Sequence, residues 1–357
     1  MADDAGQLIH DAETTPVPQR RLRSRDFLDR GRFATSPLQI PLAGWRDVLL
    51  RVKHEAQRDN LSLIAAGMAF WALLSVAPAL ALLVSIYGLL ITPEVLADQV
   101  DQLAVYLPAS ANEVLVGQLT DLATIEYSTL SFSILASAAV SLWSASKSMA
   151  ALFAGMNAVY DEEEQRSYWL RSAQSVGFTL AALVLFVVML LSLAIVPSVV
   201  GYLELSSLDF ALLRGGSLLI VGLSMMLALT VLYRYGPSRR QARWRWVASG
   251  AVFAFVVWVI ASAVLSWYAQ RFDSFQETYG ALYAVVVLLF WFYFSAYAVL
   301  LGGELNAELE HQTEVDSTVG EELPLGERGA VMADNVGPVP SWSRLYPDAD
   351  AATERQS

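Results

Sequence analysis

The sequence contains no cysteine, only three histidines and few charged residues, which make up 16% of its 357 residues. The lack of cysteine excludes disulfide bonds and metal sites with thiolate ligands. Hydrophobic residues make up 55% of the chain, and the charged residues gather in blocks between long apolar segments. This composition is too apolar for an ordinary soluble domain. The sequence therefore predicts an integral membrane protein.

The clearest membrane segment is residues 279–303, which contain no Asp, Glu, Lys, Arg, His, Asn or Gln. As a helix they would be ~37 Å long, enough to cross a hydrocarbon core of ~30 Å. Because unpaired backbone N–H and C=O groups are costly in lipid, such a segment must be helical. Five more apolar segments follow the same logic, namely residues 60–93, 127–146, 172–203, 215–233 and 246–270. The predicted fold class is therefore all-α, a polytopic membrane helical bundle with six transmembrane helices.

The chain divides into four predicted parts. Residues 1–40 and 311–357 are expected to be disordered cytoplasmic tails, and residues 61–310 are expected to form the six-span membrane domain. Residues 41–60 predict an amphipathic juxtamembrane helix that lies on the membrane surface; a linker helix packed on protein is the alternative. Residues 94–126 carry six acids and no Lys or Arg, and predict two short amphipathic extracytoplasmic helices over the outer rim.

Basic residues are distributed very unequally between the two ends of the predicted spans. When the segments are counted alternately, 21 of the 23 Lys and Arg residues lie in the two tails and in residues 147–171 and 234–245. Basic residues favour the cytoplasmic side of a membrane. Both termini are therefore predicted to be cytoplasmic, which requires an even number of spans.

Two predicted spans are too long to be single upright helices, and each contains a proline. Residues 60–93 would be ~51 Å long as a helix, so we expect a kink near Pro78. Pro197 is expected to kink or end the third span. Bent helices can line a path through a membrane protein, although a bent packing helix is the simpler alternative.

Lys147 and Glu304 are each the first charged residue at the predicted cytoplasmic end of an apolar segment. A charge near the membrane interior is costly without an opposite neighbour. We therefore expect the two side chains to lie at the same depth and to pair, with Asn157 or Asn306 completing the hydrogen bonding. A staple between two spans and a coupling site are the two interpretations of this pair.

Five arginines and no acid occupy residues 234–245, between two predicted spans. Basic side chains beside a span attract anionic headgroups, at ~1 kcal/mol per residue. We therefore expect contact with anionic membrane lipids, and a role in setting the topology alone is the alternative. The candidate residues are Arg234, Arg239, Arg240, Arg243 and Arg245.

Three motifs resemble the BrkB/YihY family of bacterial inner-membrane proteins. They are residues 65–78 (AAGMAFWALLSVAP), residues 142–147 (LWSASK) followed by Asn157, Tyr160 and Arg166, and residues 279–306, which end in LLGGELN. The resemblance covers about residues 45–310. It implies a six-helix fold in the bacterial cytoplasmic (inner) membrane, a mistaken older label of ribonuclease BN, a link of some members to serum resistance, and export of lipids or envelope precursors.

The residues offer little support for an enzyme. The six apolar segments contain no His, Cys, Asp or Glu for acid–base chemistry or metal binding, and the acids at 161–164 are most simply a solvated loop. No cofactor, metal or nucleic-acid partner is therefore expected. The predicted function is transport or export of lipid or lipid-linked envelope precursors without nucleotide hydrolysis, and a membrane scaffold or assembly factor is the alternative.

A transporter needs polar groups near a helix-lined path. The candidates are Ser75, Pro78, Ser144, Ser146, Lys147, Asn157, Glu304 and Asn306. Membrane lipids are the expected partners, and a lipid-sized cavity with a lateral opening would favour the transporter over the scaffold.

Overall fold

The computed structural model describes residues 30–90, 130–203, 207–271 and 280–338, and the regular elements of these residues are helices, with no strand. One isolated β-bridge joins Ala242 and Thr318. The predicted all-α class is confirmed for this part of the chain. Its elements are η1 (Pro37–Gln39), α2 (Leu42–Arg58), α3 (Leu61–Leu90), α6 (Leu130–Val159), α7 (Tyr168–Leu203), α8 (Ser207–Tyr235), α9 (Trp244–Arg271), α11 (Ala281–His311) and α12 (Val331–Asp334).

Four helices are long and apolar enough to cross a membrane: residues Tyr168–Met189 of α7, Gly215–Tyr235 of α8, Trp244–Arg271 of α9 and Leu282–His311 of α11. A fifth candidate combines α2 with Leu61–Val76 of α3, although the two parts meet at a bend of 62°. The described residues thus contain four or five candidate spans, and the predicted number of six is not confirmed. The predicted rim helices in residues 94–126 lie outside the described residues.

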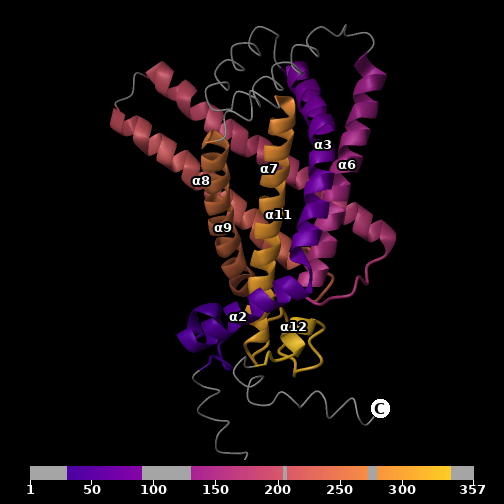
Figure 1. Cartoon of the computed structure of the whole chain (residues 1–357), viewed down its shortest axis with the longest axis vertical. Coiled ribbons are helices and arrows are strands. Elements are labelled where there is room, and N and C mark those ends of the chain that lie inside the picture. The colour runs from indigo at the N-terminus through magenta and orange to yellow at the C-terminus, as the bar shows by residue number, and fades with distance from the viewer. Residues whose placement is uncertain (1–29, 91–129, 204–206, 272–279, 339–357) are drawn as a thin grey trace, which may run out of the picture.

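The six long helices of the described residues form a ring in which most neighbours follow one another in sequence. α3 packs against α6, α6 against α7, α7 against α8, and α8 against α9. The last helix, α11, closes the ring because it packs against both α9 and α3, and it also contacts α6. In Figure 1, α11 therefore stands between α9 and α3, while the α7–α8 pair leans outward to the upper left.

α9 and α11 approach each other very closely at two glycines. A Cβ on Gly250 would lie 2.0 Å from the carbonyl oxygen of Gly302, and a Cβ on Gly302 would lie 2.6 Å from the carbonyl oxygen of Gly250. Small residues let membrane helices pack backbone against backbone. One turn after Gly302, Asn306 accepts a hydrogen bond from the Gly250 N–H at 2.7 Å and donates to the Val247 carbonyl at 3.0 Å. The predicted polar candidate Asn306 therefore joins two helices.

One end of the bundle, which we call the base, consists of α2, the loops 160–167 and 236–243, and residues 312–338 (lower part of Figure 1). α2 lies across this end. Its buried residues Val48 and Val52 pack with Trp246, Leu305 and Leu309 of α9 and α11. Part of the apolar face of α2 thus contacts protein, as the alternative of a packed helix expects, whereas Leu42, Leu49 and Leu50 are exposed. A position on the membrane surface stays a prediction.

The predicted disorder of both tails is wrong for the parts that the structure describes. We call residues 312–338 the terminal lobe. The buried Thr313 hydroxyl donates a hydrogen bond at 2.8 Å to the carbonyl of Ala34, and the Glu314 N–H donates at 2.8 Å to the carbonyl of Arg32. Polar side chains here bind backbone groups of the other tail, and such bonds order a segment that has no apolar periodicity. Residues 1–29 and 339–357 lie outside the described residues.

The two prolines of the long helices end neither of them. α3 is helical through Pro78 to Leu90, and α7 is helical through Pro197 to Leu203. Of the two alternatives for Pro197, the end of a helix is therefore wrong, and a kink stays a prediction. The side chains of both prolines lie outside the described part.

Candidate functional site

A pocket of about 670 Å³ opens at the base of the bundle, and we call it the basal pocket. The start of α7, the end of α8, the α8–α9 loop and the terminal lobe form its walls. The side chains on which its chemistry depends are Glu162, Arg166, Ser167, Leu170, Arg234, Tyr235, Arg239, Arg240 and Asp334. Segments as distant in the sequence as Glu162 and Asp334 thus meet in one polar site.

Two arginines of the basal pocket carry positive charge that no carboxylate in the described part of the chain neutralises by an ion pair. Arg234 donates to the carbonyl of Ala242 at 2.8 Å, and its guanidinium lies 4.5 Å from the ring centre of Trp244. Arg240 donates to the carbonyl of Glu321 at 3.3 Å. Hydrogen bonds to carbonyls hold these guanidinium groups in place without removing their charge, so the pocket can attract an anion.

The acids of the basal pocket are occupied by backbone donors. Glu162 accepts a hydrogen bond from the Val331 N–H at 2.8 Å. Asp334 accepts from the N–H groups of Arg328 and Gly329 at 2.8 and 3.0 Å. These carboxylates fasten the wall of the pocket rather than pair with its arginines. The pocket therefore holds Arg234 and Arg240 as cations, and Glu162 and Asp334 as anions, without an ion pair between the two sets.

Arg239 belongs to a buried polar network behind the pocket. It forms a two-point ion pair with Glu310, with N–O distances of 2.6 and 3.1 Å, and the Ser317 hydroxyl donates to the same carboxylate at 2.7 Å. The guanidinium lies 4.2 Å from the ring centre of Tyr160. Burial, the largest single effect, lowers the pKa of Arg239, but Glu310, Tyr160 and Glu162 together outweigh it and the net direction is upward. The network joins the end of α6, the α8–α9 loop, α11 and the terminal lobe.

Asn157 and Arg166, two residues of the family-like motifs, hold the rim of the pocket. The Asn157 amide donates to Glu164 at 3.0 Å and accepts from the Ser238 N–H at 2.8 Å. Arg166 donates to both carboxylate oxygens of Glu164 at 2.7 and 2.8 Å. These bonds hold the pKa of Glu164 at about 2, chiefly through Arg166. Asn157 is therefore a positioning residue that fastens one loop to another.

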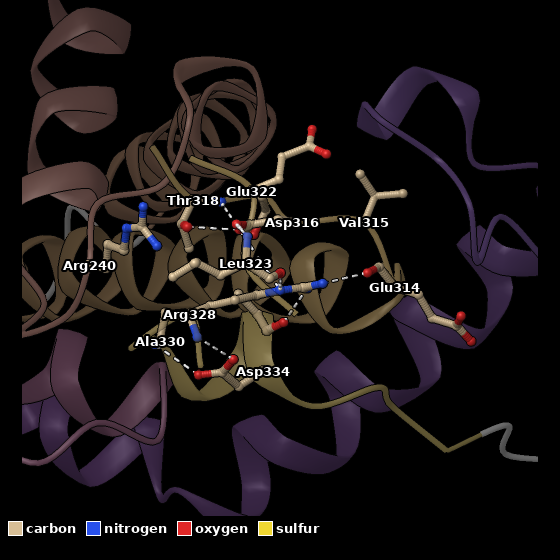
Figure 2. Close-up of polar contacts among 12 residues, drawn as sticks. Arg240, Glu314, Val315, Asp316, Thr318, Glu322, Leu323, Arg328, Ala330 and Asp334 are labelled. Carbon is tan, nitrogen blue, oxygen red and sulfur yellow. Dashed lines mark hydrogen bonds and ion pairs between the residues drawn. The ribbon is translucent and has the colours of Figure 1, made fainter. Parts of the chain in front are cut away.

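The terminal lobe is built around Arg328, which the sequence analysis missed. Figure 2 shows its guanidinium among the loops of the lobe. It donates to the carbonyls of Leu323, Ala333 and Glu314 at 3.0, 2.6 and 2.6 Å. Positive φ angles at Gly320, Gly326 and Gly329 allow the tight turns of the lobe. These glycines are the signal in the sequence that could have indicated order. The lobe reaches the pocket because the Arg240 N–H donates to the Gly329 carbonyl at 3.0 Å.

The predicted pairing of Lys147 with Glu304 is wrong in the described structure. Glu304 is fully buried, and neither of its carboxylate oxygens has a hydrogen-bond partner. Lys147 instead lies over the ring of Trp143, 5.6 Å from its centre. The depths differ because Gly303, next to Glu304, lies against Val159 at the end of α6. Lys147 precedes Val159 by twelve residues, which corresponds to ~18 Å along the helix.

The remaining candidates for a polar path are not gathered around one path. The hydroxyls of Ser75 and Ser146 each donate at 2.7 Å to a carbonyl of their own helix, from Ala72 and Trp143. Ser144 is buried in α6. Such bonds satisfy a serine within its helix and require no path.

The five arginines expected to contact lipid headgroups have different environments. Arg239 cannot make such a contact in this structure, because its side chain is 1% exposed. Arg234 is also buried, but it lines the basal pocket together with Arg240. Arg243 donates to the Thr318 carbonyl at 2.9 Å, and Arg245 is exposed. In this basic segment, Arg239 and Arg243 thus bind other parts of the protein, Arg234 and Arg240 line the pocket, and Arg245 is exposed on the surface.

Comparison with known proteins identifies the family. The family model described as virulence factor BrkB matches residues 52–323. This chain belongs to the BrkB family. A Bacillus subtilis protein called ribonuclease-like protein YfkH is 32% identical over 271 residues, which cover 73% of this chain and 93% of the relative. No solved structure matches the chain.

Other relatives of this BrkB family member are named UPF0761 membrane proteins. The one from Tolumonas auensis is 30% identical over 164 residues, which cover 45% of this chain and 52% of the relative. IL2447 from Idiomarina loihiensis is 35% identical over 80 residues, which cover 22% of this chain and 28% of the relative. These names, together with the candidate spans, describe a membrane protein. In the described residues, no group of three or more His, Asp or Glu side chains is placed to hold a metal ion.

Proposed function

We propose that this BrkB family member transports an anionic amphiphile, such as a lipid or a lipid-linked envelope precursor, without hydrolysing nucleotide. The observation that carries this proposal is the basal pocket, where Arg234 and Arg240 have no carboxylate partner among the described residues. Two fixed guanidinium groups are suited to a phosphate or carboxylate headgroup, because their N–H groups can donate to paired oxygens.

The start of α7 favours an anion at the same place. Ser167 and Leu170 line the pocket, and the Ser167 hydroxyl accepts a hydrogen bond from the Leu170 N–H at 3.4 Å. The N-terminal end of a helix carries partial positive charge, which adds to the charge of the arginines. A headgroup in the basal pocket would therefore meet the guanidinium groups of Arg234 and Arg240 and the N-terminal end of α7.

Apolar and aromatic side chains beside the pocket suit the rest of an amphiphile. Tyr168 and Trp169 are 69% and 80% exposed at the start of α7. Tyr and Trp side chains prefer the boundary between lipid and water, so this end of α7 is suited to the interface. Farther along α7, the side chains of Leu180, Val184 and Val188 are exposed at intervals of four residues, so they share one apolar helix face that suits acyl chains. Headgroup and tails would thus have binding surfaces along the same helix.

The predicted topology places the basal pocket on the cytoplasmic side, which is where basic residues are concentrated. Anionic lipids give that leaflet a negative surface potential. The proposed substrate would then be taken from the cytoplasmic leaflet, with export as the direction of transport.

A membrane scaffold is the second candidate function. It is favoured by three exposed apolar side chains near α2, namely Phe33, Leu38 and Leu42, which are 56%, 95% and 89% exposed. Exposed apolar residues at one place can bind a partner protein. The scaffold requires only this surface, whereas the transporter requires the basal pocket.

Lipid binding and movement test the proposal directly. The full-length protein would be purified in nanodiscs of native lipid, and its co-purifying lipids identified by mass spectrometry. It would then be reconstituted to measure movement of fluorescent phosphatidylglycerol between leaflets. We expect enrichment of an anionic amphiphile and movement above protein-free liposomes.

Variants of the pocket sharpen this test. The combined change Arg234→Gln and Arg240→Gln removes two charges worth ~1 kcal/mol each, so anionic lipid should bind about 30-fold more weakly. Arg240→Gln alone keeps the buried Arg234 in place and should weaken binding several-fold. Arg245→Gln is the matched control, because Arg245 is exposed and does not line the pocket. No enriched lipid and no movement above protein-free liposomes would refute the transporter and leave the scaffold.

A further inference from the structure

Glu304 of α11 is a buried carboxyl group that does not line the basal pocket. Its exposure is 0%, and both of its side-chain oxygens lack a hydrogen-bond partner. A buried carboxylate without donors or a cation is among the least favourable groups that a protein can contain. Something must therefore remove its negative charge.

The surroundings of Glu304 make a negative charge still less favourable. The carboxyl groups that act on it electrostatically are Glu308 on its own helix, Glu55 and Asp59 at the end of α2, and Asp161 after α6. We call these four residues together with Glu304 the acidic cluster. The other groups near it are Arg58 and the phenol of Tyr160. α3 and α9, which also pack against α11, contain no acid.

The basic residues near the acidic cluster are engaged elsewhere. Arg58 is 56% exposed and pairs with Glu55 at 2.8 Å and Asp161 at 3.3 Å. Arg51 is paired with Glu308. Lys147 lies about three helical turns away along α6. Each of these cations already has another partner or another place in the fold.

A metal ion does not fit the acidic cluster as it is arranged. No three acidic or histidine side chains in the described part of the chain converge on a point where an ion could be held. A proton needs no such geometry, because it binds to a single carboxylate oxygen. A protonated carboxyl also loses only the hydrogen bonds of a neutral group, which is far less costly than a buried charge.

We propose that Glu304 is a proton-binding site, in which the fold of the base holds a neutral carboxylic acid between the α2–α3 turn, the end of α6 and α11. The inference rests on the burial of Glu304, its missing partners and the acids around it, and it does not depend on lipid transport. Ionisable residues within membrane helices are commonly proton carriers.

Loss of this proton would act on the part of the base that is already strained. Asn60 in the α2–α3 turn and Asp161 after α6 both have positive φ angles, of 53° and 52°, which residues other than glycine seldom adopt. A charged Glu304 would repel Asp59 and Asp161 on these two turns. Deprotonation is therefore expected to push α2 and the α6–α7 loop away from α11. Proton binding to Glu304 would in turn stabilise the arrangement in which both pack against α11.

Infrared spectroscopy of the full-length protein in nanodiscs tests the protonation state. The wild type, labelled with ¹³C-glutamate, should show the C=O stretching band of a protonated glutamic acid at pH 7, where exposed glutamates are ionised. The same band should be missing from Glu304→Gln. A wild-type spectrum without this band at pH 7 would overturn the proposal, and that measurement does not depend on whether any variant folds.

Thermal unfolding provides the second readout. Glu304→Gln mimics the protonated group, so its midpoint at pH 7 should lie within ~2 °C of the wild type. When the pH is raised towards 10, the wild type should lose more stability than Glu304→Gln, because the folded protein binds the proton that the unfolded chain releases. Glu308→Gln is the control on the same helix, and it should be destabilised at pH 7 because it breaks the pair with Arg51.

Two results would contradict the proton site. If Glu304→Gln were destabilised at pH 7 as much as Glu308→Gln, Glu304 would be a charged and paired residue. If sodium raised the unfolding midpoint of the wild type above its value in potassium, and did not do so for Glu304→Gln, the ligand would be a metal cation.

Discussion

The buried pair of Arg239 and Glu310 permits a quantitative test of the structure. Their side chains are 1% and 0% exposed, and the two N–O contacts are 2.6 and 3.1 Å. Removing one partner of such a pair leaves the other charge uncompensated, which costs ~3–5 kcal/mol. Glu310→Gln also weakens the bond from Ser317, whereas Arg239→Met removes the cation from the ring of Tyr160. Both single variants should therefore be strongly destabilised.

The double variant separates this explanation from a general effect of changing the base. With Arg239→Met and Glu310→Gln together, no charge remains buried, so the loss should be smaller than in either single variant. The measurement is thermal unfolding in nanodiscs, where ~3–5 kcal/mol corresponds to about 6–10 °C in the midpoint. Arg240→Gln is the matched control on the same loop and should change the midpoint by less than ~2 °C. The reasoning fails if the losses of the two single variants simply add in the double variant.

Three further predictions concern other parts of the fold. Gly250→Ala should prevent α9 and α11 from packing, because its Cβ would lie 2.0 Å from the Gly302 carbonyl oxygen; a folded yield equal to that of Gly177→Ala, whose Cβ meets no atom within 4 Å, would contradict this. Arg328→Gln should expose the terminal lobe to limited proteolysis while leaving the bundle intact, since Arg328 binds three carbonyls of the lobe. Burial and then the charge of Asp161 raise the pKa of Asp59 to about 6. The folded protein therefore binds more protons than the unfolded chain between pH 4 and 6, so wild-type stability should fall as the pH rises through this window, and Asp59→Asn should remove that part of the dependence.

The family-like motifs were informative about position but not about role. Asn157 and Arg166 were recognised in the sequence, and the structure shows them joined through Glu164 at the rim of the basal pocket. Glu304 was expected to pair with Lys147 because both end an apolar segment. That rule treats each segment as an upright rod that ends at the same depth. In the structure, α6 continues for twelve residues beyond Lys147, so the two charges lie at different heights.

The sequence by itself determined the helical class and the membrane location, because long segments without charge can satisfy their backbone in lipid only as helices. Only the tertiary structure decided what the polar residues do. Arg234 and Arg239 are five positions apart in one basic segment and both line the pocket, yet only Arg239 is paired with a carboxylate, that of Glu310. The partner of a polar side chain depends on which distant segment folds against it. Such contacts, including those that order the terminal lobe, leave no periodic signal in the sequence.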